Sequence, residues 1–211
     1  MRSAAQGTAT KVLMGVLTAS YVFNLVSGGL VLSMLVLSNE YVYLGEYWRL
    51  VTYAFTSAGL LGLLMNLLVL WLAGRAMEAA LGSWRFAALY VAAGLGGASL
   101  SFAIGPPGLV AVGASSAVIG LLAANALVKR RGGEDIRPDI GLLVLLVLYS
   151  VLVGFSSFGW IGLIGGIAVG ALVGAVMAYT PRDRRVVFQV IGLLGVVLLC
   201  VVGVGLRMMS Y

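Results

Sequence analysis

The chain has 211 residues, of which 62% are hydrophobic and only 9% carry a charge. This composition excludes a water-soluble domain, because so few charged side chains would leave most of the surface apolar. The formal net charge of +6 does not indicate nucleic-acid binding, because the basic residues fall in short connections where anionic lipid would attract them. We therefore expect an all-α polytopic membrane protein in which residues 1–211 form a single domain.

Apolar runs of about 20 residues recur along the chain, and each is long enough to cross a hydrocarbon core of roughly 30 Å. In chain order they predict seven transmembrane helices, at about residues 12–37, 57–81, 84–104, 113–128, 140–157, 160–179 and 187–206. The first six make up a core at about 12–180, and the seventh is an extra C-terminal helix. The first run follows a short basic segment, as in a signal peptide, but its length favours a retained helix.

Lys and Arg residues lie unevenly on the two sides of these predicted helices. With the N-terminus in the cytoplasm, 11 of the 13 basic residues are on the inner side: Arg2, Lys11, Arg75, Arg85, Lys129, Arg130, Arg131, Arg137, Arg182, Arg184 and Arg185. Arg49 and Arg207 fall on the outer side. Because cytoplasmic loops are enriched in Lys and Arg, this distribution predicts an N-in, C-out topology. We expect the membrane to be a prokaryotic plasma membrane.

The longest outer connection, at about 38–56, is rich in aromatic residues. It contains Tyr41, Tyr43, Tyr47, Trp48, Arg49 and Tyr53. Aromatic side chains favour the headgroup level of a bilayer, so the simplest role for Trp48 and Arg49 is interfacial anchoring. At the inner end of the second predicted helix, Arg75 and Glu78 are three residues apart and are expected to pair. Cys200 is the only cysteine, and we expect no disulfide, no metal and no cofactor.

Glycine is abundant, at 30 residues, and it follows a pattern in the sixth predicted helix. The pattern comprises Gly162, Gly166, Gly170 and Gly174, which recur every four residues and so share one helix face. A face of small residues lets another membrane helix approach closely. Gly113 and Gly120 offer a matching flat face on the fourth predicted helix, and we expect all six glycines to serve helix packing.

The fourth predicted helix begins with Gly113-Ala114-Ser115-Ser116. A serine hydroxyl is a poor nucleophile without a positioned base, and imidazole is the usual base, yet the chain contains no histidine. The lysines map to the inner side, a guanidinium does not release its proton usefully, and an unperturbed phenol has a pKa of about 10. We therefore expect Ser115 either to cap the helix through its oxygen or to serve packing.

Several motifs in this chain resemble those of the rhomboid family of intramembrane serine proteases. They are Tyr47-Trp48-Arg49-Leu50-Val51-Thr52, Phe55-Thr56-Ser57, Asn66, Gly74-Arg75, Glu78, Gly82-Ser83-Trp84-Arg85-Phe86, Gly113-Ala114-Ser115 and the glycines of the sixth predicted helix. The match covers about residues 45–180, and the motifs fall in the family's order and at its membrane depth. The resemblance implies a rhomboid-like core of six helices, to which the seventh is added. It also implies, as an alternative to simple anchoring, that the loop with Trp48 and Arg49 helps to shape the bilayer around the fold.

The resemblance also implies which residues stand at the family's catalytic positions. Active rhomboids use a serine that opens the fourth helix and a histidine on the sixth helix. The serine position holds Ser115, followed by Ser116 where a glycine is usual, and the histidine position holds Leu163. A looser alignment places Trp160 there instead.

The second helix of the family often carries two histidines and an asparagine, of which the second histidine and the asparagine help to stabilise the oxyanion. By the resemblance these positions hold Ser57, Gly62 and Asn66. The base and one oxyanion donor are therefore expected to be missing. Asn66, a polar residue within a membrane helix, is expected to hydrogen-bond to a neighbouring helix.

These correspondences predict a protein that is not an enzyme: a rhomboid-like pseudoprotease that binds transmembrane helices of membrane partners without cleaving them. The partner helix would dock beside the second and fifth helices. Two alternatives remain open. One is a structural or accessory subunit of a larger membrane complex. The other is a weak intramembrane serine protease that uses Ser115 with a non-histidine base or with a base supplied by a partner. The expected partners are membrane lipids and the transmembrane helix of a client or complex partner.

Overall fold

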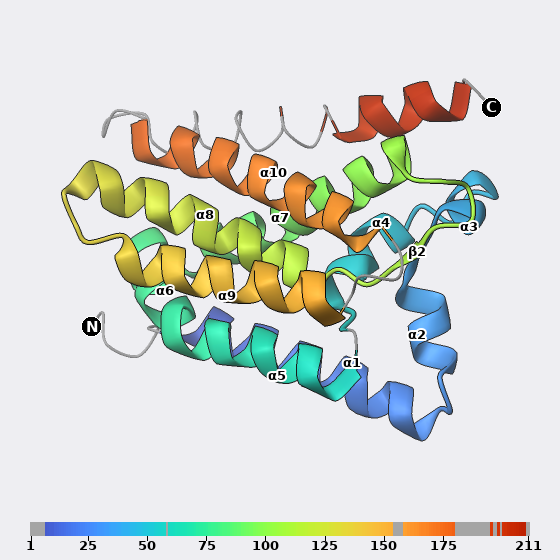
Figure 1. The fold of residues 1–211 in the computed structure, drawn as a ribbon, viewed down its shortest axis with the longest axis horizontal. Coiled ribbons are helices and arrows are strands. Elements are labelled where there is room, and N and C mark those ends of the chain that lie inside the picture. The colour runs from blue at the N-terminus through green and yellow to red at the C-terminus, as the bar shows by residue number, and fades with distance from the viewer. Residues whose placement is uncertain are drawn as a thin grey trace.

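The computed structural model describes residues 7–57, 59–153, 158–179, 195, 198 and 200–209, which are helical almost throughout (Figure 1). In chain order the elements are α1 (Thr8–Val26), α2 (Leu30–Leu35), β1 (Leu37–Ser38), α3 (Asn39–Tyr43), α4 (Arg49–Thr52), the 3-10 turn η1 (Tyr53–Phe55), α5 (Gly59–Val69), the π-helical turn η2 (Leu70–Gly74), α6 (Arg75–Leu81), α7 (Ser83–Ile104), β2 (Val110–Ala111), α8 (Ala114–Gly132), α9 (Arg137–Val153) and α10 (Gly159–Tyr179). A further apolar helix, here called the C-terminal helix, spans Cys200–Met209.

Four helices among the described residues are long and apolar enough to cross a membrane. They are Thr8–Val26, Gly59–Leu81, Ser83–Ile104 and Gly159–Ala178. The chain is therefore a mostly helical, polytopic membrane protein, which confirms the predicted fold class at this level. Two further predicted helices are present as α8, whose last turn carries three basic residues, and α9, which has 17 residues. The seventh predicted helix, at about 187–206, lies mostly outside the described residues.

The first predicted helix is divided in two, so the expectation of one continuous helix over 12–37 is wrong. α1 ends at Val26 and α2 begins at Leu30. Between them Gly28 and Gly29 have φ angles of +63° and +98°, a left-handed conformation that glycine adopts without the steric cost of a Cβ. The side chain of Asn24 stabilises the break, because its Oδ1 accepts a hydrogen bond of 3.0 Å from the Leu32 amide.

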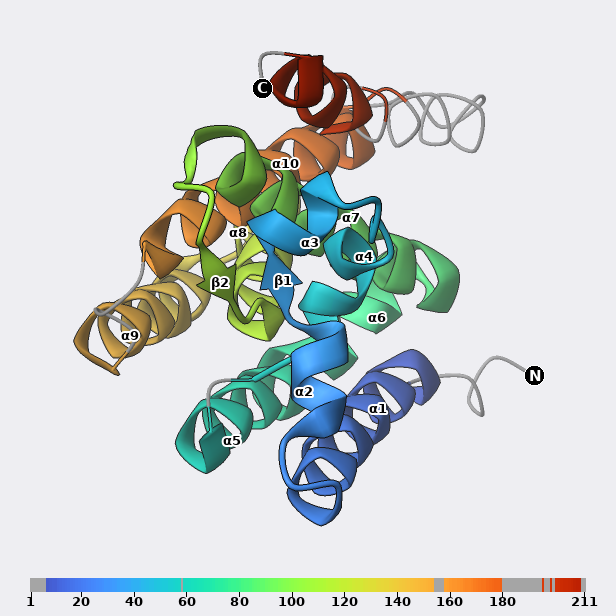
Figure 2. The ribbon, with the colours of Figure 1, turned by 90° about the vertical axis from the view of Figure 1, so that its right-hand side faces the viewer.

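A short antiparallel pairing follows α2, and the sequence pattern did not predict it. Leu37 of β1 pairs with Ala111 of β2, and Ser38 pairs with Val110. Figure 2 shows α2 running from the end of α1 to this pairing. The pairing ties the segment after α2 to the segment that leads into α8, so it helps to hold the start of α8 in place.

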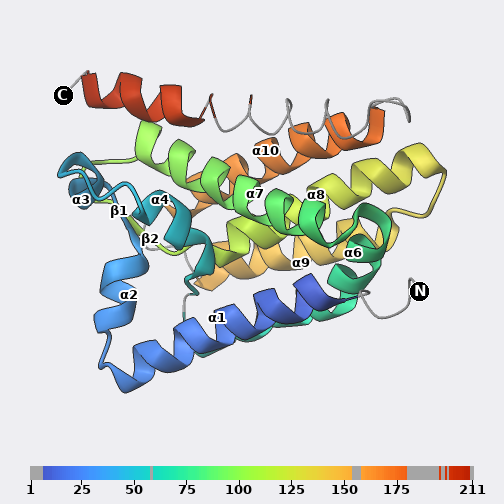
Figure 3. The ribbon, with the colours of Figure 1, turned by 180° about the vertical axis from the view of Figure 1, so that it is seen from behind.

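The centre of the molecule is formed by α7, α8 and α10. α10 packs against both α7 and α8, and α9 packs against α8. α1 and α5 lie side by side on the opposite side of α9 and α8 from α10 (Figures 1 and 3). The main buried cluster includes Leu17 of α1, Leu70 of η2 and Ile119 of α8. The start of α8, which carries the serine pair, is therefore enclosed by α5, α7 and α10.

Candidate functional site

The start of α8 is fixed by hydrogen bonds that its backbone amides donate to carbonyl oxygens of the η1 segment and of Thr56. The amide of Gly113 donates to the carbonyl oxygen of Tyr53 at 3.1 Å, and the amide of Ala114 donates to that of Thr56 at 2.9 Å. The η1 segment is itself held by α7, because the Tyr90 hydroxyl donates to the Ala54 carbonyl at 2.7 Å. The helix start is thus positioned by buried main-chain contacts.

The two serines that follow have different surroundings. Ser116 is buried, and its hydroxyl donates to the Gly113 carbonyl at 2.7 Å. Ser115 is partly exposed, and its side chain makes no hydrogen bond with the described residues. Gly113 is the N-cap residue and no side chain caps the helix, so the expectation that Ser115 caps α8 is wrong. Its hydroxyl is left available.

Tyr53 fills the space between the start of α8 and the start of α10. It is fully buried, whereas the sequence suggested a place in an interfacial aromatic belt. A Cβ added at Gly113 would overlap its ring, and one added at Gly162 would overlap its hydroxyl. Burial raises the pKa of the Tyr53 phenol, so the phenol keeps its proton at neutral pH and is not a base for Ser115. The signal for this contact in the sequence is the pair of glycines, but nothing in the sequence connects them to Tyr53.

The position at which the resemblance places the family histidine holds a buried aliphatic residue. Leu163 on α10 is 8% exposed and belongs to the same apolar cluster as Ala114 and Ala117 of α8. Trp160, the alternative position, is 52% exposed. Neither side chain can accept a proton.

Asn66 and Ser57 are hydrogen-bonded to each other, and Ser57 directly follows Thr56, whose carbonyl accepts the bond from Ala114. Asn66 lies on α5 and is 1% exposed, and Gly62, one turn earlier, is also buried. The Asn66 Nδ2 donates to the Ser57 Oγ at 3.5 Å, a long hydrogen bond. Its Oδ1 is buried without a partner among the described residues. The expected bond from Asn66 to a neighbouring helix is therefore replaced by one to the segment that precedes its own helix.

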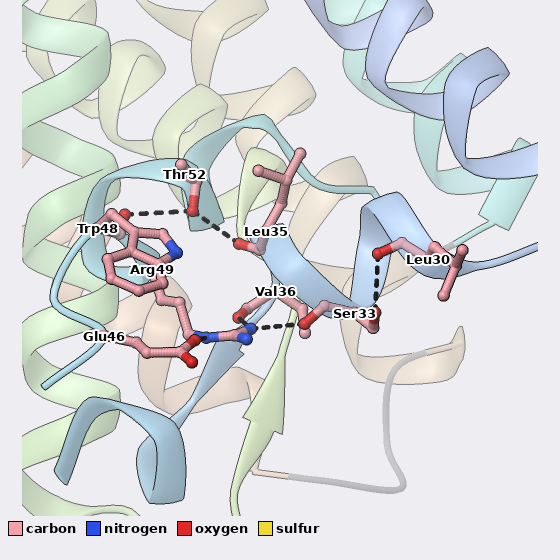
Figure 4. Close-up of polar contacts among 8 residues, drawn as sticks. All are labelled: Leu30, Ser33, Leu35, Val36, Glu46, Trp48, Arg49 and Thr52. Carbon is pink, nitrogen blue, oxygen red and sulfur yellow. Dashed lines mark hydrogen bonds and ion pairs between the residues drawn. The ribbon is translucent and has the colours of Figure 1, made fainter. Parts of the chain in front are cut away.

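Arg49 is buried, and Figure 4 shows its guanidinium between the Glu46 side chain and the backbone at Ser33 and Val36. Its Nη1 donates to the carbonyl oxygens of Ser33 at 2.6 Å and Val36 at 3.0 Å, and its Nε pairs with Glu46. Trp48 beside it is 55% exposed. Arg49 thus connects the end of α2 to α4. Sequence reasoning missed its carbonyl partners, because backbone acceptors leave no mark in a sequence.

Glu78 of α6 holds the N-terminus of α1. Its carboxylate accepts hydrogen bonds from the amides of Ala9 and Thr10, both at 2.9 Å, from the Thr10 hydroxyl at 2.8 Å and from the Ser83 hydroxyl at 2.6 Å. A carboxylate at a helix N-terminus is favoured by the helix dipole. Among the described residues Glu78 forms no ion pair with Arg75, so that expectation is wrong.

Gly120, Gly166, Gly170 and Gly174 lie where α8 and α10 meet closely, whereas Gly113 and Gly162 face the Tyr53 side chain, so the expectation of helix packing is wrong for Gly113. A Cβ added at any of these six glycines would fall within 3.0 Å of a neighbouring atom. Gly166 faces the backbone of Ser116, and Gly170 faces the backbone of Gly120. The distance between α8 and α10 is therefore set by main-chain contact beside the serine pair.

Polar side chains also connect α8 to α9 at the far end of α8. Asp139 is buried and accepts hydrogen bonds from Asn125 and Lys129, both at 2.8 Å. Within the described ranges, no three His, Cys, Asp or Glu side chains gather into a possible metal site. Polar side chains thus connect α8 to α9 at the far end of α8, whereas its start is held by main-chain hydrogen bonds to the η1 segment and Thr56.

Comparison with known proteins gives a consistent assignment. A family model described as the Rhomboid domain matches residues 44–180. The chain is 34% identical over 143 residues to the Rhomboid protease GluP of Bacillus subtilis. The aligned residues make up 64% of this chain and 28% of GluP. It is 32% identical over 143 residues to RHOMBOID-like protein 5 of Arabidopsis thaliana, covering 65% of this chain and 46% of that protein. It is 26% identical over 147 residues to Rhomboid-type serine protease 2 of Emericella nidulans, covering 66% of this chain and 29% of that protein. The chain thus spans less than half the length of these relatives.

These comparisons contradict the expectation that the chain is not an enzyme. Two of these relatives are named as proteases. We based that expectation on the absence of histidine. Histidine would supply only the proton acceptor, and the serine nucleophile is a separate group. The serine position, Ser115, lies within the matched residues 44–180 and its hydroxyl is available. The missing imidazole limits how Ser115 can be activated, and it does not decide whether a reaction takes place.

Proposed function

We propose, because the chain belongs to the rhomboid family, that it binds the transmembrane helix of a membrane protein and cleaves a peptide bond presented to Ser115. The observation that carries this proposal is the difference between the two serines that open α8. The hydroxyl of Ser116 donates to the Gly113 carbonyl, whereas Ser115 is a partly exposed residue whose hydroxyl makes no hydrogen bond with the described residues. Ser115 is thus the serine that a bound segment can reach.

The reaction needs a proton acceptor for the Ser115 hydroxyl. In acyl transfer the hydroxyl attacks the scissile carbonyl, its proton passes to the acceptor, and the acceptor later protonates the leaving amine. The sequence has no histidine, and burial keeps the Tyr53 phenol protonated. We therefore propose that a partner polypeptide in the membrane supplies the acceptor.

Binding of the substrate helix is supported by the polar groups near the site. The Oδ1 of Asn66 is buried without a partner among the described residues, and an unpaired polar group in a membrane protein is costly. Asn66 is 1% exposed, so an N–H of a locally unwound substrate segment would reach this oxygen only after the Asn66 side chain turns towards the bound segment. A substrate helix with small or helix-destabilising residues would present its peptide bonds most easily.

We further propose seven transmembrane helices with the N-terminus in the cytoplasm and the C-terminus outside, in a prokaryotic plasma membrane. The distribution of Lys and Arg supports this topology, as do the three basic residues in the last turn of α8. Reporter fusions after residues 132 and 211 test it. An outer location for the first fusion point or an inner location for the second would contradict the topology.

A fluorophosphonate probe that forms a covalent bond with activated serines tests the proposed reaction. The matched pair of variants is Ser115→Ala and Ser116→Ala, which remove hydroxyls from adjacent residues. In native membranes we expect the probe to label the unaltered chain and Ser116→Ala, but not Ser115→Ala. After purification away from partners we expect labelling to disappear and to return when the partner is added.

Three results would count against the proposed reaction or its proposed proton acceptor. Absence of labelling in native membranes, with the protein folded, would show that Ser115 is not activated. Labelling that survives in Ser115→Ala would show that another serine reacts. Labelling that persists in the fully purified chain would keep Ser115 as the nucleophile but overturn the partner-supplied acceptor.

A further inference from the structure

A cavity of about 370 Å³ lies between the C-terminal helix, α7 and the segment that leads into α4. Its walls are mainly apolar and include Leu50, Leu95 and Val204, with Gly205 on the C-terminal helix leaving room. Figures 1 and 2 show the C-terminal helix lying over the end of α7 near α3. We propose that this cavity binds one acyl chain of a membrane phospholipid.

The size and lining of the cavity fit an acyl chain. Its volume of about 370 Å³ lies within the range of roughly 300–1,000 Å³ that is typical of small-molecule sites. Its lining residues are mainly apolar, which suits a hydrocarbon chain and disfavours a polar ligand.

The depth of the cavity fits a phospholipid that has its headgroup at the membrane surface. The hydroxyl of Tyr47, a lining residue, lies 3.6 Å from the Sδ of Met208 on the opposite wall. Tyr47 and the neighbouring aromatic residues of the α3 to α4 segment are typical of the headgroup level. The acyl chain would therefore enter from the headgroup region and extend along α7 towards Ser99.

A basic residue stands beside the cavity at the same level. Arg207 lies between the lining residues Gly205 and Met208 in the sequence, and its Nε donates to the Tyr43 hydroxyl at 3.0 Å. The Tyr43 ring in turn packs against Phe102 at 4.8 Å between centroids. This contact holds a guanidinium near the cavity, and guanidinium groups bind phosphate well. The charge therefore favours a phospholipid over a neutral lipid.

Two glycines of the C-terminal helix provide matched variants. A Cβ added at Gly203 or at Gly205 would have no atom within 4 Å among the described residues, so both positions accept a larger side chain. Gly205 lines the cavity, whereas Gly203 is not among its lining residues. Gly205→Phe should fill the space that the acyl chain would occupy, and Gly203→Phe should leave it open.

Native mass spectrometry of the protein, after exchange into a detergent that strips loosely held lipid, tests the proposal. We expect one phospholipid to remain on the unaltered chain and on Gly203→Phe, and to be lost from Gly205→Phe. Leu95→Phe fills the cavity from α7 and should lose the lipid as well, which keeps the test valid if Gly205→Phe disturbs the C-terminal helix. Retention of the lipid by both filled variants, or its absence from the unaltered chain, would overturn the proposal. Retention of a fatty acid in place of a phospholipid would overturn the choice of ligand.

Discussion

Replacing Gly170 by alanine should force α8 and α10 apart. A Cβ at Gly170 would lie 2.5 Å from the carbonyl carbon and 2.6 Å from the Cα of Gly120, whereas ordinary van der Waals contacts are 3.4–4 Å. The atoms in the way belong to the backbone, so no rotamer change can relieve the overlap. The helices would have to separate by roughly 1 Å, which would also loosen the close approaches at Gly166 and Gly174.

The expected magnitude follows from two opposing effects. Overpacking of a well-packed interior costs roughly 1–3 kcal/mol, and contact with backbone places Gly170→Ala near the upper end, at about 3 kcal/mol. Alanine also has a helix propensity that is better than that of glycine by about 1 kcal/mol. The net loss in the free energy of unfolding is therefore about 2 kcal/mol.

Equilibrium unfolding in mixed micelles measures this loss, and Gly141→Ala is the matched control. Gly141 lies within α9, and a Cβ added there would have no atom within 4 Å among the described residues. The control should therefore be neutral or slightly stabilising, because it gains helix propensity without overlap. If Gly170→Ala is as stable as Gly141→Ala, the close approach of α8 and α10 does not limit stability and the reasoning fails.

Two further predictions concern buried charged groups. Glu78→Gln should reduce the free energy of unfolding by about 1–3 kcal/mol, because an amide nitrogen replaces one carboxylate oxygen and cannot accept either the bonds from Ala9 and Ser83 or those from Thr10. Equal unfolding curves for the two proteins would contradict this. Arg49→Lys should make the segment after α2 more accessible to protease, because an ammonium group cannot reproduce the arrangement of the guanidinium towards Ser33, Val36 and Glu46. An unchanged cleavage rate in that segment would show that charge alone is sufficient.

The long apolar helices could be predicted closely from the sequence. The expected segments 84–104 and 160–179 correspond to Ser83–Ile104 and Gly159–Tyr179, because a membrane helix needs an uninterrupted apolar run and this chain bounds those runs clearly. The break at Gly28 and Gly29 was missed. Glycine is common within membrane helices, and a hydropathy pattern carries no information about the backbone φ angles that interrupt a helix.

The contacts of the candidate site were harder to predict than its residues. Motif order located Ser115 and Asn66, but the partners of the surrounding groups lie far away in the sequence. The Tyr53 side chain packs between Gly113 and Gly162, and Glu78 is bonded to α1 residues 68 and 69 positions earlier. Such pairings depend on the three-dimensional arrangement of the helices, which local periodicity does not contain.

The close packing of α8 on α10 makes Leu163 the position at which the chemistry can be tested separately from the fold. The spacing of the two helices is fixed by backbone contacts at Gly166 and Gly170, which a change at residue 163 leaves intact. Leu163→His should therefore place an imidazole on α10 without moving Ser115, and the purified variant should be labelled by a fluorophosphonate probe.

An imidazole accepts a proton only in its neutral form, so this labelling should rise with pH through the ordinary histidine pKa of about 6.5. Burial at this position, where Leu163 is 8% exposed, penalises the charged form and would move the rise to lower pH. The double variant Leu163→His with Ser115→Ala should give no labelling. Labelling that does not depend on pH, or that survives in the double variant, would show that residue 163 is not placed to activate Ser115. The correspondence between Leu163 and the family histidine would then be incorrect, whatever the outcome for the unaltered chain.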